Sequence, residues 1–436
     1  MRYIEQIKTG VLLFLVALSL LLTFMIWTYK PDYGVIEEKE VEEIIIDEPT
    51  SLSKVLRPYK LVFRGESSWR GTVSTSNVDN VLNVMHDWTL ADLTLITNTF
   101  DAQQFNDLVR TPDHMTMIFA EEVPIALFRE FFQLDVERTP NMSFDRFVVY
   151  WDAETKAAQA YFVNLQNAVL YEAQIMMPTP NDDEMMLHDV INASTDYTEI
   201  TRDNATSLYV VKDAVETVQY TYHTGEASVD KFVRSLFSDY SSVNKQTNSA
   251  ASEQYISASE KMDVNPIRRQ FKYVNPRGRA EQLTPDELIY QTFRFINSTG
   301  SFTGDFRYVY GNPGRNLTQY QLFVQGFPVY SEDSSTFISL TWRGGRPYEY
   351  DRPYYTLDIA DMQAKALMSG TAAISTLSLQ NPELLQIIDD LVVGYTLKHT
   401  ENSRIFVLEP SWFAIQGMKY IRIDPNMIGG TFNGLE

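Results

Sequence analysis

The sequence has no cysteine, few histidines and a shortage of positive charge. The absence of cysteine excludes disulfide bonds, thiolate zinc sites, iron–sulfur clusters and a cysteine nucleophile. None of the five histidines stands in H-E-x-x-H or a similar ligand spacing, so we expect each to be a satisfied residue at the surface or its boundary. A net charge of −21 disfavours nucleic acid, which binds clustered cations. We expect no metal, no cofactor and no nucleic-acid partner.

Charge is also missing from one long run near the start of the chain. Residues 9–29 are 21 uncharged residues, twelve of them Leu, Val, Ile or Phe, and as a helix they would span about 30 Å, the thickness of a bilayer core. A cleaved signal peptide has a shorter apolar region and a small-residue cleavage site, whereas this run ends in bulky residues at Trp27 and Tyr29. An uncleaved transmembrane anchor is therefore the preferred interpretation, over a signal peptide or a buried core helix.

The flanks of this run predict its orientation. Arg2 and Lys8 precede it, and an acidic stretch follows it, with seven carboxylates between Glu37 and Glu48. Positive charge favours the cytoplasmic side, so residues 1–8 are expected inside the cell and the bulk of the chain outside. The carboxylates repel one another and predict an extended stalk.

Signatures of catalysis are scarce. The sequence contains no G-x-S-x-G, Walker loop or G-x-G-x-x-G. Ser51–Lys54 and Ser228–Lys231 have the Ser-x-x-Lys spacing of penicillin-binding enzymes, but the Lys-Thr-Gly at 8–10 would lie across the membrane from both. We expect no enzyme and no catalytic residue.

Periodicity after residue 50 predicts alternating helices and strands. Apolar residues at helical spacing predict a helix over 78–85, and Asp101 is expected to cap another. A strand-like segment lies between them, and an antiparallel meander is expected from about 144. Residues 178–190 and 240–254 are expected to be loops.

The second half suggests a weak repeat. Residues 228–237 and 284–293 share a cap, an Asp and paired apolar residues. Hairpins are expected to turn at 312–314, 344–345 and 416–417, and a helix is expected over 358–370.

These elements predict an α+β protein in which an N-terminal transmembrane helix precedes several outer domains of antiparallel sheets with helices packed on one face. The expected divisions are a cytoplasmic tail (1–8), the transmembrane helix (9–29), an acidic stalk (30–50), an N-terminal outer α+β domain (51–205), a middle helix-plus-sheet domain (206–278) and a C-terminal α+β domain (279–436).

Several motifs together resemble the YycH (WalH) family of Gram-positive bacteria. They are "SVDKFVRSLFSD" (228–239), "FKYVNP" (271–276), "YQLFVQGFPVY" (320–330) and "VLEPSWF" (407–413). The resemblance extends over essentially the whole chain, although related YycI proteins have hairpins similar to the third motif. It implies a regulator of the YycFG (WalRK) two-component system of cell-wall metabolism. Such a protein acts with a YycI-type partner on the membrane-bound sensor histidine kinase, mostly restraining it and in some relatives activating it.

Contact between membrane helices is central in that family, so the small and hydroxyl residues of the run are candidate interaction residues: Gly10, Ala17, Ser19 and Thr23. Ala17 and Ser19 lie on different faces, so only a subset would be used. Ordinary lipid-facing positions are an equal alternative.

Two other functions stay open at this point. One is a binding module for wall fragments or peptides, using hairpin aromatics at Tyr308, Phe323, Trp342 and Tyr350, although such rings more often belong to a core. The other is a wall-associated hydrolase whose polar site the sequence does not reveal.

Overall fold

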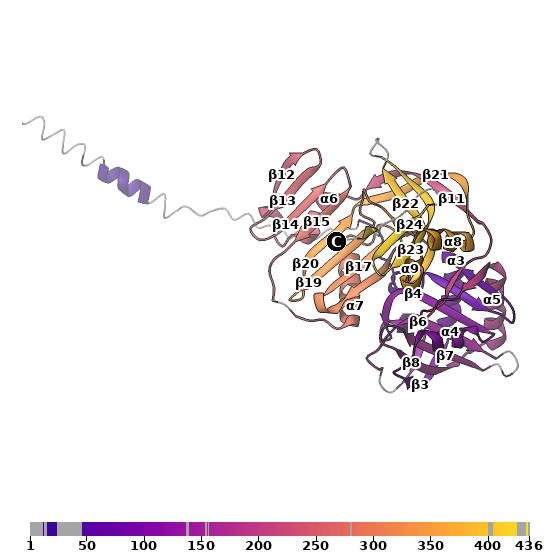
Figure 1. Cartoon of the computed structure of the whole chain (residues 1–436). Helices are drawn as coiled ribbons and strands as arrows, with labels where there is room; N and C mark the ends of the chain where they lie inside the picture. The colour runs from indigo at the N-terminus through magenta and orange to yellow at the C-terminus, as the bar shows by residue number, and fades with distance from the viewer. Residues whose placement is uncertain are drawn as a thin grey trace, which may run out of the picture. The chain divides into compact units, whose positions relative to one another are not determined.

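The computed structural model describes residues 12, 15–23, 46–136, 139–152, 155, 157–279, 281–399, 404–424 and 433–434. The chain divides into two compact units, Met1–Ile44 and Ile45–Glu436. In the first unit, the described residues are helical and their side chains are exposed. The second unit contains two sheets and the helices that cover them (Figure 1).

The first sheet has ten strands within the described residues. All its neighbouring strands pair antiparallel except β3 and β5, which pair in parallel. In spatial order the strands are β10 (Leu208–Val211), β9 (Thr195–Ile200), β2 (Trp69–Thr72), β1 (Lys60–Arg64), β4 (His114–Pro124), β6 (Ser143–Trp151), β7 (Ala158–Asn164), β8 (Val169–Met176), β3 (Thr89–Thr97) and β5 (Gln133–Asp135).

Helices cover both faces of this sheet. Alternate residues of β1 point to opposite sides: Leu61 and Phe63 pack with α3 (Thr75–Met85) and α5 (Pro180–Ala193), whereas Val62 packs with α4 (Ala102–Arg110). The expectation of helices on one face only is therefore wrong for this sheet, because its central strands are apolar on both sides. Two further short helical segments of this part of the chain are α2 (Leu52–Val55) and η1 (Phe128–Glu130).

The second sheet has fifteen strands in the described part of the chain. Its main path runs β12 (Asn244–Ser249), β13 (Ser252–Ile256), β14 (Lys261–Asn265), β15 (Gln270–Val274), β20 (Arg346–Pro353), β19 (Phe337–Arg343), β17 (Leu317–Val324), β18 (Phe327–Tyr330), β22 (Asp390–His399), β23 (Ile405–Gln416), β11 (Val215–Glu226) and β21 (Tyr355–Leu367), with β16 (Phe306–Asn312) beside β17, β24 (Lys419–Ile423) beside β23 and β25 (Asn433–Gly434) beside β24. The pair β18–β22 is parallel, so both sheets are mixed.

The helices associated with the second sheet are α6 (Val229–Leu236), α7 (Pro285–Ser298), α8 (Gly370–Gln380) and α9 (Pro382–Ile387), with 3-10 turns η2 (Tyr240–Ser242) and η3 (Pro313–Arg315). Strand β15 pairs with β20, so the predicted middle and C-terminal domains share one sheet. Whether 51–205, 206–278 and 279–436 are separate folding units stays a prediction.

Several local predictions are confirmed. The 78–85 pattern lies within α3, and its Val78, Val81, Leu82 and Met85 are buried. Asp101 caps α4 and Thr284 caps α7, each in a capping box. The turn at 344–345 joins β19 to β20 with two glycines in the left-handed region.

Three local predictions are wrong. The segment predicted as a loop at 178–190 forms α5, where Pro180 starts the helix, two aspartates occupy its first turn, and Leu187 and Val190 are buried. The supposed loop at 240–254 contains the hairpin β12–β13, and every residue of β12 is exposed. Residues 358–367, expected to be helical, belong to strand β21, because pairing with β11 overrides their helical composition.

Candidate functional site at the junction of the two sheets

The N-terminal candidate residues are described only in part. Ala17, Ser19 and Thr23 lie on exposed helix, and the Thr23 hydroxyl donates to the Ser19 carbonyl at 2.8 Å. Gly10 lies outside the described residues. In the part of the chain that the structure describes, no helix is both long and apolar enough to cross a membrane. The role of Gly10, Ala17, Ser19 and Thr23 in contacts between membrane helices stays a prediction.

The four hairpin aromatics are core residues. Tyr308, Phe323, Trp342 and Tyr350 are all buried, and the Trp342 indole donates to Thr292 at 2.8 Å. Trp342 and Tyr350 pack against Phe295 of α7, whereas Phe323 packs with Val309 and Phe337. Phe323 nevertheless lines the cleft described below, so ligand binding by the hairpin aromatics stays a prediction.

One histidine also departs from expectation. His114, at the start of β4, is 4 % exposed, and its Nδ1 lies 2.8 Å from the Thr111 carbonyl. Burial lowers its pKa. It is satisfied as expected, but it lies in the interior and not at the surface or its boundary.

The two sheets meet at a buried polar cluster that the sequence does not reveal. Lys60 begins β1 and Asp390 begins β22, and their Nζ and Oδ2 atoms lie 2.5 Å apart. The Lys60 side chain is 3 % exposed and that of Asp390 is 9 % exposed. The Tyr59 hydroxyl donates to the same Asp390 oxygen at 2.7 Å, and the Leu391 amide donates to its other oxygen at 2.8 Å. Asp390 thus ties the first strand of one sheet to the other sheet.

Burial, with a contribution from Asp390, raises the pKa of the Tyr59 phenol well above its ordinary value. Tyr59 therefore remains a neutral donor. The Lys60 ammonium also donates to the Tyr209 carbonyl at 3.3 Å, so two protein acceptors compensate for its removal from water.

Arg202 makes a second tie across the junction. From the segment between β9 and β10, its Nη1 donates to the carbonyls of Ile388 at 2.6 Å and Leu385 at 3.1 Å, at the end of α9. Its Nε donates to the Thr206 carbonyl at 2.8 Å. Burial lowers the pKa of Arg202, although a guanidinium remains charged at neutral pH. One side chain thereby joins α9 to the connecting segment 201–207.

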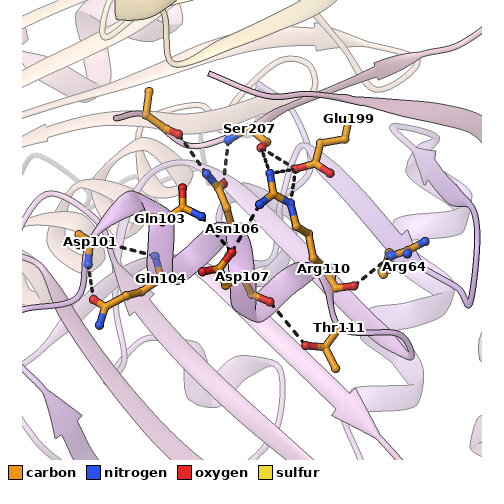
Figure 2. Close-up of polar contacts among 11 residues, drawn as sticks. Arg64, Asp101, Gln103, Gln104, Asn106, Asp107, Arg110, Thr111, Glu199 and Ser207 are labelled. Carbon is orange, nitrogen blue, oxygen red and sulfur yellow. Dashed lines mark hydrogen bonds and ion pairs between the residues drawn. The ribbon is translucent and has the colours of Figure 1, made fainter. Parts of the chain in front are cut away.

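Side chains of helix α4 also bind this connecting segment (Figure 2). The Asn106 side chain donates to the Ala205 carbonyl at 3.1 Å and accepts from the Ser207 amide at 2.8 Å. One turn later, Arg110 Nη2 lies 2.8 Å from a Glu199 oxygen, which also accepts from the Ser207 hydroxyl at 2.6 Å. The i, i+4 spacing of Asn106 and Arg110 places both on one helix face.

A cleft of about 540 Å³ opens beside this junction and receives lining residues from both sheets. Its lining carries charge of both signs, with Glu121, Asp145, Asp389, Arg146 and Lys419 among the contributors. Burial raises the pKa of Glu121 to about 7, and the neighbouring Glu122 and Asp145 carboxylates add to the shift. The volume of the cleft lies within the range of small-molecule sites, but its lining carries more charge than such sites usually do.

No group of three or more His, Asp or Glu is placed to hold a metal ion among the residues whose positions are described. The junction residues Tyr59, Lys60, Arg202 and Asp390 were missed as a group. The available signal was a charge directly beside an apolar strand, in "YKLVF" (59–63) and "DDLVV" (389–393), because such a charge needs a buried partner. The sequence does not say which two meet.

Comparison with known proteins identifies the family. Residues 5–188 match the YycH protein N-terminal domain and residues 205–426 match the YycH protein C-terminal domain. The chain is 22 % identical to the Bacillus subtilis (strain 168) protein named "Two-component system WalR/WalK regulatory protein YycH", over 99 % of each chain.

The crystal structure of YycH from Bacillus subtilis has the same fold, with a TM-score of 0.75 and 18 % identity, over 88 % of this chain and 100 % of that one. The matches to both domains together extend over most of the sequence, as the resemblance in its motifs predicts. This chain belongs to the YycH family.

Proposed function

We propose that this protein is a membrane-anchored, non-catalytic regulator of the sensor histidine kinase in a two-component system of the WalR/WalK (YycFG) type, which controls cell-wall metabolism. The observation that carries the proposal is the alignment with a relative named as a WalR/WalK regulatory protein, over 99 % of both chains. A shared full length supports a shared role better than one shared domain does, because both domains of the family are then included.

The proposed topology places residues 1–8 in the cytoplasm, 9–29 across the membrane and the remainder outside the cell. It is supported by the 21 uncharged residues at 9–29 and by the excess of positive charge before them. With so little chain inside, the signal passes through the helix. Its partners are the kinase, a YycI-type regulator and membrane lipid, and Gly10, Ala17, Ser19 and Thr23 are the candidate contacts. The expected sign is restraint of the kinase.

The deciding experiment replaces residues 9–29 with a scrambled sequence of equal composition in the full chain. Kinase output is read from a reporter of the response regulator, and folding of the outer part is checked by limited proteolysis. We expect the scrambled helix to give the same elevated output as deletion of the whole protein. A matched control exchanges only lipid-type residues, Leu12 for Ile and Leu15 for Ile, and keeps regulation. Normal regulation with the scrambled helix would contradict the proposal.

A binding module is the second candidate, and the 540 Å³ cleft favours it. Its mixed charge suits a zwitterionic ligand such as a wall peptide, which carries both ammonium and carboxylate groups. Isothermal titration of the full chain with muropeptides tests this role. Lys419→Ala in the cleft should weaken binding, whereas Lys261→Ala, an exposed lysine of β14, should not. Turnover of the same peptides would instead support the third possibility, a hydrolase.

A further inference from the structure

Strand β21 forms an open edge of the second sheet. It pairs with β11 from Tyr355 to Leu367, with a register shift that leaves Asp358 unpaired, and it ends the main strand path on its other side (Figure 1). Residues from Asp358 onward are nearly all exposed. Two of them are large and apolar: Ile359 is 72 % exposed and Met362 is 70 % exposed. Long exposed edges of this kind are templates for another strand, and soluble proteins normally protect them.

The two faces of β21 differ in polarity. On one face Ala360, Met362 and Ala364 lie opposite Tyr222, Tyr220 and Val218 of β11, so this face continues the apolar side of the sheet. The other face carries Asp361, Gln363 and Lys365 opposite Thr221, Gln219 and Thr217, with the apolar Ile359 and Leu367 at the two ends of this polar run. An added strand must therefore present apolar side chains on one face and charged or polar ones on the other.

The strand's own sequence meets this requirement in one antiparallel register. If Gln363 lies opposite its own copy, then Asp361 faces Lys365 and Lys365 faces Asp361, which gives two opposite-charge pairs. In the same register Met362 faces Ala364, and Ile359 faces Leu367. Every pair follows from the sequence "DIADMQAKAL" (358–367), because in this register a residue that lies a given number of positions before Gln363 faces the residue that lies the same number of positions after it. Opposite charges and apolar pairs across strands stabilise a sheet.

We propose that two copies of this protein associate through β21, antiparallel about Gln363, to form the continuous ribbon β11–β21–β21–β11. The occupant of the open edge is a second copy, because a two-fold interface must be self-complementary and this register is so in both charge and polarity. The inference does not rest on the regulatory role, since it concerns assembly alone.

Charge exchange tests the register in the full chain in detergent micelles, with the dimer dissociation constant measured by analytical ultracentrifugation. Asp361→Lys and Lys365→Glu each place two like-charge pairs across the interface, so each should weaken the dimer about tenfold or more. The double variant D361K/K365E restores both pairs and should dimerise as the natural chain does. The two single variants should also associate with each other when mixed, because every cross pair is then of opposite charge.

A cysteine placed on the axis gives an independent readout, since the chain contains no cysteine of its own. Opposed residues of antiparallel strands have Cα atoms about 4.5–5.5 Å apart, within the range of a disulfide. Gln363→Cys should therefore form a covalent dimer under mild oxidation. Asp361→Cys is the matched control, because the two copies of position 361 lie four residues out of register and should not cross-link.

The result that overturns the proposal is a monomer at all concentrations, or a dimer whose stability ignores both charge reversals. A dimer that is weakened by the single variants but not restored by the double variant would also overturn the proposal, because the double variant again places residues 361 and 365 opposite each other with opposite charges. Capture of a different protein at β21, with no self-association, would replace the second copy by that partner.

Discussion

The junction of the two sheets and the open edge of β21 differ in whether their side chains are covered within the chain: β1 and β22 are interior strands whose charges meet each other, whereas β21 ends its sheet. At the junction, Asp390 accepts three hydrogen bonds and Lys60 is 3 % exposed on its side chain. At β21, Ile359 and Met362 are each at least 70 % exposed. The first surface is completed within the chain, and the second has the features of a surface completed by another molecule. Substitutions should therefore affect stability at the junction and association at β21.

The largest effect is expected at the junction. Asp390→Ala leaves the Lys60 ammonium buried without its carboxylate, and breaking a buried pair in this way typically costs about 3–5 kcal/mol. The free energy of unfolding of the full chain, from urea titration in detergent micelles, measures the loss. Asp263→Ala is the matched control: it removes the partner of Lys261, but both side chains are more than 40 % exposed, so about 1 kcal/mol or less is expected.

A double variant distinguishes the cost of an unpaired buried charge from the cost of losing the Asp390 side chain itself. Lys60→Met with Asp390→Leu removes both charges and should recover much of the stability lost in Asp390→Ala, because no unpaired charge remains buried. Equal losses of unfolding free energy in Asp390→Ala and Asp263→Ala would show that the Lys60–Asp390 pair is as accessible to solvent as a surface pair. The contrast between the junction and β21 would then be wrong.

A smaller, pH-dependent effect is expected from the cleft beside the junction. The pKa of Glu121 is about 7 in the folded protein against an ordinary value of 4.5, so the folded state holds a proton that the unfolded chain has released. Stability from this group is therefore present below about pH 4.5 and is lost as the pH rises to about 7. Between pH 5 and 8 the natural chain should lose on the order of 2 kcal/mol relative to Glu121→Gln.

The comparison with Glu121→Gln isolates this carboxyl group. Asp351 also has a raised pKa, to about 6, but it is present in both chains and cancels. Unfolding free energies with the same pH dependence in the two proteins would count against a protonated Glu121.

The contrast between the two surfaces also explains what the sequence could predict. The caps at Asp101 and Thr284 and the apolar period of α3 are local signals, and the structure bears them out. The strand state of β21 was not predicted, because Ala, Met, Gln and Lys favour a helix locally and the pairing partner β11 lies about 130 to 150 residues earlier in the chain. The pairing at the junction was not predicted for the same reason, because Lys60 and Asp390 are 330 residues apart in the sequence.

Large separation along the sequence also explains why the residues of the junction were not predicted as a group. A lysine beside an apolar strand indicates that it has a buried partner of opposite charge. Which residue is that partner depends on the folded structure and cannot be predicted from the sequence. The family, by contrast, could be identified from motifs spread along the sequence, because each motif is read locally and only their order is long-range.

The smallest expected effect on stability is at the open edge. Met362→Lys places a charge on a side chain that is already 70 % exposed, so the unfolding free energy of the monomer should change by no more than about 0.5 kcal/mol. Association should nevertheless be lost, because a lysine on the apolar face of an edge strand blocks pairing with another strand. Thr247→Lys on the edge strand β12, whose residues are all exposed, is the matched control and should leave both quantities unchanged. A large loss of monomer stability in Met362→Lys would mean that β21 is already covered within its own chain, which would remove the distinction between the closed junction and the open edge.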